Sequence, residues 1–196
     1  PGPVSVPDRG VRLMGTLTQR DIEITTAAAL LEAVSERLAE TEAGAPPWVY
    51  LVPGSDVAWD YCNCDGQLTI HQATAYPSRS FPAQDVSTDS CLASYTVVHF
   101  VVTILRCVPT QDDEGHPPAP AEMTAAALVD WSDRRAVRKG VLCYFEALAA
   151  VDRRRPAPLV VIQEQLGVGA DGQCGGSELH MLVGFPNCAS CDEVVP

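Results

Sequence analysis

One segment, residues 95–108 (YTVVHFVVTILRCV), constrains the fold most, because it is apolar on both sides of an extended chain. Alternate side chains of a strand point to opposite faces of the sheet. One face here carries Val98, Phe100, Val102 and Ile104, and the other carries Tyr95, Val97, His99, Val101 and Leu105. A strand with two apolar faces is expected at the centre of a sheet, or between helices on one face and a partner on the other.

Hydrophobic periodicity predicts a helix before this strand. Apolar residues recur at helical spacing behind a variant of the capping box at residues 18–21, and the pattern ends near Gly44 and Pro46. The predicted buried stripe is Ile24, Ala27, Leu31, Val34 and Leu38.

A second helix is predicted at residues 121–151, which are rich in Ala and Leu. We expect it to be broken or kinked near Ser132 or Gly140 and to end before Pro156. The predicted buried side is Leu128, Trp131, Val141, Phe145 and Leu148.

Short β-rich runs predict four further strands, at residues 48–52, 66–76, 159–162 and 177–185. In the second of these, Leu68 and Ile70 should point one way, and Thr69 and His71 the other. The order is helix, three strands, helix, two strands, which favours an α+β fold: a small mixed or antiparallel sheet of about five strands flanked by two main helices.

Proline and glycine mark the connections and the ends. Residues 1–17 are expected to be an extended arm, residues 18–186 a single domain, and residues 187–196 a cysteine-containing tail. Residues 77–90 and 110–120 are expected to be loops. There is no apolar stretch long enough for a transmembrane helix. The start, residues 1–10, lacks the regions of a secretory signal, so synthesis in a cytosol is expected.

The net charge of −12 argues against a nucleic-acid binder, because phosphate binding depends on Lys and Arg. The basic run at residues 153–155 is expected to be a solvated helix end. A protein with an acidic surface could still form a wall that DNA slides past without adhering. Lys139 is the only lysine among the 13 basic residues, a bias typical of a GC-rich genome.

Eight cysteines leave several chemistries open. Cys107 and Cys143 lie in apolar elements and are expected to be plain buried residues. The other six lie in loops or at element ends: Cys62, Cys64, Cys91, Cys174, Cys188 and Cys191. Cys188 and Cys191 have the CxxC spacing of a zinc half-site, which Cys62 and Cys64 would complete. Disulfides or free thiols are favoured over zinc, and redox catalysis is disfavoured by the neighbouring acids.

Motifs for catalysis are weak. Residues 167–172 match GxGxxG, but another strand follows where a phosphate site needs a helix, so a hairpin loop is expected. Cys174 would need a histidine partner to act as a nucleophile, and His71, His99 and His180 each fall within a predicted strand, where histidines are mostly structural. The acids at residues 112–114 are expected to form a solvated turn. No catalytic, cofactor-binding or metal-binding residue is assigned, and no cofactor is expected.

Three segments and the order of elements resemble the tail-terminator and related neck proteins of long-tailed phages that infect actinobacteria. The segments are GQLTIHQATAYPS (66–78), YTVVHFVVTILRCVP (95–109) and GADGQCGGSELHMLVGFP (169–186), and with both helices the resemblance spans residues 20–186. The Arg-rich, Lys-poor composition agrees with such a source. The cysteines depart from the family's pattern.

The resemblance implies a structural virion protein and not an enzyme. It implies a homo-oligomeric, six-fold ring that caps the tail tube protein and joins it to the connector proteins of the head. DNA would pass through the lumen without specific binding, and no membrane is involved. The expected location is the phage neck or tail, after synthesis in the host cytoplasm. The arm at residues 1–17 or the loop at 110–120 is expected to reach a neighbouring subunit. The alternatives are an adaptor or stopper of the same neck, or a zinc- or thiol-dependent enzyme.

Overall fold

The computed structural model of the chain describes residues 22–54, 66–85, 94–112, 114–151, 158–171 and 173–186. Within these residues, seven elements follow one another in the predicted order, which confirms the α+β class. They are α1 (Ile22–Ala39), β1 (Trp48–Leu51), β2 (Gln67–Ser78), β3 (Tyr95–Cys107), α2 (Pro120–Val151), β4 (Leu159–Asp171) and β5 (Cys174–Pro186). Several predictions fall outside the described residues: the arm, the tail, the 153–155 run, Cys62, Cys64, Cys91, Cys188 and Cys191.

The five strands form one mixed sheet in the order β1-β2-β3-β5-β4. β1 runs parallel to β2, and the other neighbours are antiparallel. β3 lies at the centre and pairs along its full length with β5. The prediction that residues 95–108 form the central strand is therefore confirmed, and the reason is the one in the sequence: both of its faces are apolar, so both must be covered.

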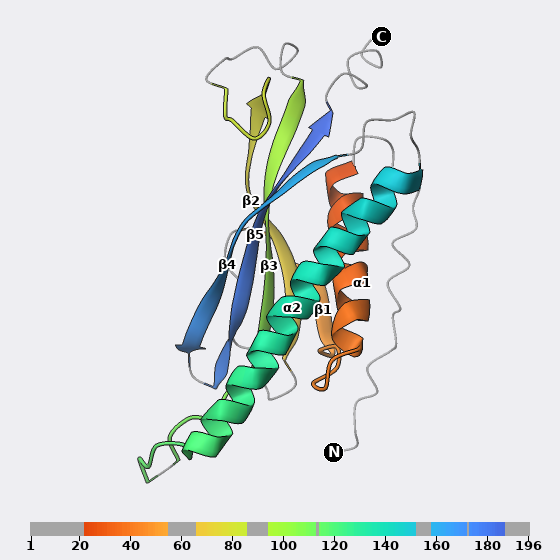
Figure 1. Cartoon of the computed structure of the whole chain (residues 1–196). Coiled ribbons are helices and arrows are strands. Elements are labelled where there is room, and N and C mark those ends of the chain that lie inside the picture. The colour runs from red at the N-terminus through yellow and green to blue at the C-terminus, as the bar shows by residue number, and fades with distance from the viewer. Residues whose placement is uncertain are drawn as a thin grey trace, which may run out of the picture.

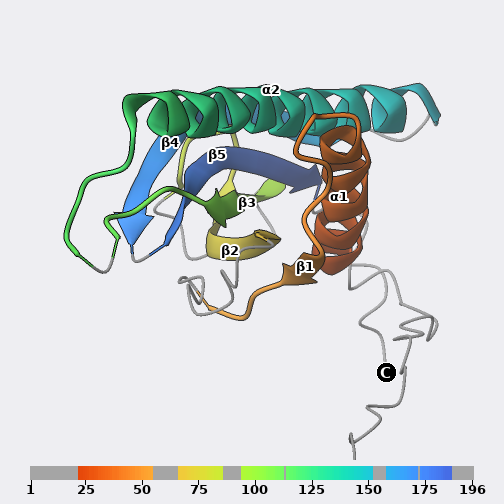
Figure 2. The same cartoon turned by 90° about the horizontal axis from the view of Figure 1, so that it is seen from below.

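Both helices pack against the same face of the sheet (Figures 1 and 2). Figure 2 shows α2 lying across the sheet, with α1 beside it and close to β1. One predicted face of β2 and one of β3 form the core with both helices, and Leu179, Met181 and Val183 of β5 join them. The core residues of these two faces are Leu68 and Ile70 of β2 and Val98, Phe100, Val102 and Ile104 of β3. The result is a two-layer α+β arrangement.

In α1 the predicted stripe is buried except at its start. Ala27, Leu31, Val34 and Leu38 belong to the core, and Leu30 joins them. Ile24 is exposed, so its prediction was wrong. It lies in the first turn, where the helix has only just reached the edge of the core.

The second helix differs from its prediction in two ways. It runs unbroken for 32 residues, without a break at Ser132 or Gly140. A Cβ on Gly140 would lie 2.9 Å from the Cα of Val34, so this glycine serves the close approach of α1 and is not a kink. Leu128 and Trp131, predicted to be buried, are 58% and 62% exposed.

In the second half of α2 the predicted inner side is confirmed for Val141 and Phe145, and Leu148 packs partly buried against the core. Val137, Val141 and Phe145 are buried in the core, with Asp133 buried nearer the helix start. Leu128 and Trp131 are three residues apart and therefore share a helix face, but it is the outer one. Hydrophobicity alone does not identify the inner face of a helix that has apolar residues all round.

The β4–β5 hairpin is longer than predicted. β4 continues to Asp171 and β5 begins at Cys174, so residues 167–171 are strand and not loop. Hydrogen bonds between β4 and β5 hold these glycines in the strands, so the glycine content of the sequence predicted too long a loop. β2 likewise extends to Ser78, beyond its predicted end.

The sheet face opposite the helices is also largely buried at its centre. Val97, Val101 and Leu105 of β3 are each at most 2% exposed. Part of the cover comes from the turn after β2, where Phe81 packs on Gly184 and forms an edge contact with Tyr95. We call this side of the sheet the far face. No described helix is long and apolar enough to cross a membrane.

Candidate functional site

Three of the chain's four histidines lie together on the far face. In the register of the sheet, His71 of β2 lies opposite Val101 of β3, Val101 lies opposite His180 of β5, and His180 lies opposite Glu164 of β4. His99 is two residues from Val101 on the same strand and thus on the same face. We call His71, His99, His180 and Glu164 the histidine row.

Two of these imidazoles are in direct contact. His99 Nε2 lies 3.2 Å from His180 Nδ1, and the ring centroids are 5.3 Å apart. At this distance one nitrogen carries a proton and donates it to the other. On the other side of the His180 ring, Nε2 lies 3.6 Å from Glu178 Oε2. A carboxylate and two imidazoles thus form a line across β5 and β3.

The surroundings keep His99 neutral. Its pKa lies below the ordinary value, first because of burial and then because of repulsion from His180 and His71, while Glu164 acts in the opposite direction. A neutral imidazole is the form that binds metals or accepts protons. The sequence predicts three mostly structural strand histidines but not that they lie together, because the register that brings them together depends on long-range pairing.

A pH-dependent stability follows from His99. The unfolded chain takes up a proton at His99 near pH 6.5, whereas the folded chain does so at lower pH. Between these values the unfolded state binds more protons, so the free energy of unfolding falls as the pH falls. We expect urea denaturation at about pH 7.5 and about pH 5.5 to show a smaller loss of stability in His99→Gln than in the wild type. An equal loss of stability in His99→Gln and in the wild type would contradict this assignment.

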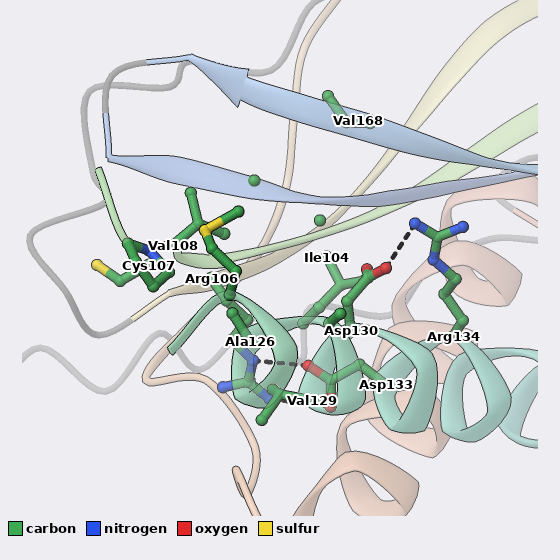
Figure 3. Close-up of a pocket in the computed structure, with 15 residues that line it drawn as sticks. Ile104, Arg106, Cys107, Val108, Ala126, Val129, Asp130, Asp133, Arg134 and Val168 are labelled. Atoms are coloured by element: carbon green, nitrogen blue, oxygen red, sulfur yellow. Dashed lines mark hydrogen bonds and ion pairs between the residues drawn. The ribbon is translucent and has the colours of Figure 1, made fainter. Parts of the chain in front are cut away.

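A separate cavity of about 290 Å³ lies between α2 and the adjoining ends of β3 and β5 (Figure 3). Its polar lining consists mainly of two ion pairs. Arg106 of β3 binds Asp133 of α2, with Nε 2.8 Å from Oδ2, and Arg134 Nη2 lies 2.5 Å from Asp130 Oδ2. The apolar lining includes Ile104, Val108, Met123, Ala126, Val129 and Val168.

These ion pairs have a structural explanation. Asp133 is 1% exposed, and Arg106 also donates to the carbonyl oxygen of Gly44 in the loop after α1. The pair thereby connects β3, α2 and the end of α1. Cys107 also lines the cavity, and the described lining residues include no histidine.

The acids at residues 112–114 belong to an exposed turn, as far as they are described. Asp112 accepts hydrogen bonds from the backbone N–H groups of Glu114 and His116, and its pKa is lowered mainly by the bond from His116. Asp112, Glu114 and His116 bring three donor atoms within 4.8 Å of one another. The turn geometry accounts for this arrangement without a metal.

Three cysteines lie in the described residues. Cys107 and Cys143 are not in disulfides and are only half-buried, so neither is the plain buried residue that the sequence predicts. Cys174 is buried and disulfide-bonded, and neither of these two is its partner. A bonded sulfur is not a thiolate, so Cys174 does not act as a nucleophile in this state.

Exposed apolar side chains lie on both edge strands of the sheet. β1 exposes Trp48, Val49 and Leu51, and β4 exposes Leu159, Val161 and Leu166. In the described part of the chain, neither strand pairs with another beyond its single neighbour. Edge strands with apolar side chains favour association with a further chain. A third exposed group, Leu128, Trp131 and Leu142, lies on α2.

Comparison with known proteins provides no relative, because neither a protein-family model nor a curated protein matches the chain.

Proposed function

We propose that this chain is a structural subunit of a phage neck, a tail-terminator-like ring that caps the tail tube and joins it to the head connector. The observation that carries the proposal is the pair of exposed apolar sheet edges, β1 and β4. The resemblance of residues 20–186 to tail-terminator proteins supplies the biological setting.

A closed ring needs two different surfaces on each subunit, one for each neighbour. β1 and β4 lie at opposite ends of the strand order, so they supply two such surfaces that differ in length and composition. An isologous dimer would instead need only one self-complementary patch. The arrangement of the edges therefore favours side-by-side assembly over a two-fold dimer.

The charge of the chain fits a ring through which DNA passes. With a net charge of −12, a ring of such subunits would repel the phosphate backbone. A lumen that repels DNA lets it pass during ejection without specific binding. The six-fold symmetry of the proposed ring comes from the resemblance and not from the strands themselves.

The edge contact leads to a prediction for assembly. Val161→Lys together with Leu166→Lys places two charges on the exposed apolar side of β4 and is expected to prevent ring formation, because charged residues on an edge strand block association. Native mass spectrometry should show a six-fold ring for the wild type and a monomer for the variant. Gln163→Lys, an exposed polar position on the same strand, should still form the ring.

The same measurement tests the alternatives. A wild-type ring of twelve would assign the chain to an adaptor or stopper instead of the terminator. A wild-type chain that stays monomeric, both alone and with tail tubes, would overturn the proposal. Rings that form equally well in the double lysine variant would show that β4 is not the contact.

A further inference from the structure

We propose that His99 and His180 form a binding site on the far face for a divalent transition-metal ion such as Zn²⁺, Co²⁺ or Ni²⁺. The inference is independent of the ring assembly proposed above. Imidazole nitrogen is a preferred ligand for these ions.

The spacing of the two nitrogens fits one ion between them. A metal–nitrogen distance of about 2.0–2.1 Å in a tetrahedral site places two ligand nitrogens roughly 3.3 Å apart. His99 Nε2 and His180 Nδ1 are 3.2 Å apart. An ion bound to both would replace the single proton that they share, with only a small movement of the rings.

Glu178 supplies the outer contact that metal-binding histidines generally have. Such a histidine donates its second ring N–H to a carboxylate, which fixes the tautomer and raises the basicity of the ligating nitrogen. His180 has Nδ1 toward His99, while its Nε2 lies 3.6 Å from Glu178 Oε2. Nε2 is buried and makes no hydrogen bond within 3.5 Å, so a slight closure of this gap would complete the arrangement.

Further donors lie in the same row. His71 and Glu164 are placed on either side of the pair by the strand register, and both interact electrostatically with His99. The His180 side chain is 20% exposed, so an ion can reach the site from solvent. The donor atoms of His71 and Glu164 do not lie within 4.8 Å of both ligating nitrogens, so water would fill the remaining coordination positions.

Cobalt binding tests the site with a defined probe. The full chain, stripped of metal with a chelator, should bind one Co²⁺, and the absorption spectrum should lack the thiolate-to-cobalt charge-transfer band. His99→Ala and His180→Ala should each weaken binding by at least about tenfold. Glu178→Gln should weaken it by about 10–100-fold while the stoichiometry stays at one, as expected for an outer contact.

Matched variants separate this site from its rivals. His116→Ala removes a donor from the exposed Asp112, Glu114 and His116 cluster and should leave binding unchanged. Cys188→Ser with Cys191→Ser tests the alternative four-cysteine zinc set considered from the sequence and should also leave Co²⁺ binding unchanged. Circular dichroism and native mass establish that each variant is folded.

A direct readout avoids dependence on the variants. In the wild-type chain, Co²⁺ should broaden the imidazole proton resonances of His99 and His180 at a lower Co²⁺ concentration than those of His116. The proposal is overturned if the wild type binds no Co²⁺ at millimolar concentration. It is also overturned if binding shows the thiolate band, or if it survives unchanged in both His99→Ala and His180→Ala.

Discussion

Replacing Asp133 with alanine is expected to lower the free energy of unfolding by about 3–5 kcal/mol, because it leaves a charged guanidinium without its partner. Asp133 is 1% exposed, and Arg106, which it binds through both carboxylate oxygens, is 14% exposed. Thr41, in the loop after α1, also lies within 3.4 Å of this carboxylate. The loss of the pair should therefore loosen β3, α2 and the α1 loop together.

Urea denaturation measures this effect, and two controls define its origin. Glu40→Ala breaks the exposed Arg37–Glu40 pair and should cost no more than about 1 kcal/mol. Arg106→Met combined with Asp133→Leu removes both charges and should recover most of the loss, because a buried pair contributes little more than an apolar replacement. A loss below about 1 kcal/mol in Asp133→Ala would mean that water reaches Arg106 freely.

Phe100→Ala should also destabilise the chain by about 3–5 kcal/mol, because it empties the centre of the core. Phe100 is 3% exposed, and its ring meets Phe185 edge-on, with centroids 6.4 Å apart. Leu31 and Val34 of α1 belong to the same cluster. The truncation would therefore leave a cavity beneath α1.

The matched control is Leu128→Ala on α2. This leucine is 58% exposed, so its truncation should change the free energy of unfolding by less than about 0.5 kcal/mol. Chemical denaturation of both variants thus tests whether the first half of α2 exposes Leu128, as the structure has it, or buries it, as hydrophobicity predicts. A large loss of stability in Leu128→Ala would show that this leucine is buried, as the sequence predicts.

The sequence predicted the strand in which each histidine of the candidate site lies, but not that these histidines come together. His71, His99 and His180 were each predicted to lie in a strand, and each does. What brings His99 to within hydrogen-bonding distance of His180 is the antiparallel register of β3 and β5, which joins residues 81 apart in the chain. Pairing over that distance depends on which strands become neighbours, and local preference contains no information on that choice.

By itself the sequence determined the local structure: the α+β class, the order of seven elements and the central position of residues 95–108. Each follows from side-chain period and from the need to cover two apolar faces. Only the tertiary structure decided which side of the first half of α2 faces inward, because Leu128 and Trp131 are as apolar as the residues that are buried. It also decided the role of Gly140 and the length of the β4–β5 hairpin, since close helix contact and ladder hydrogen bonds outweigh the preferences of glycine. The tertiary structure likewise decided the Arg106–Asp133 pair and the histidine row, because both exist only where separate strands and helices meet.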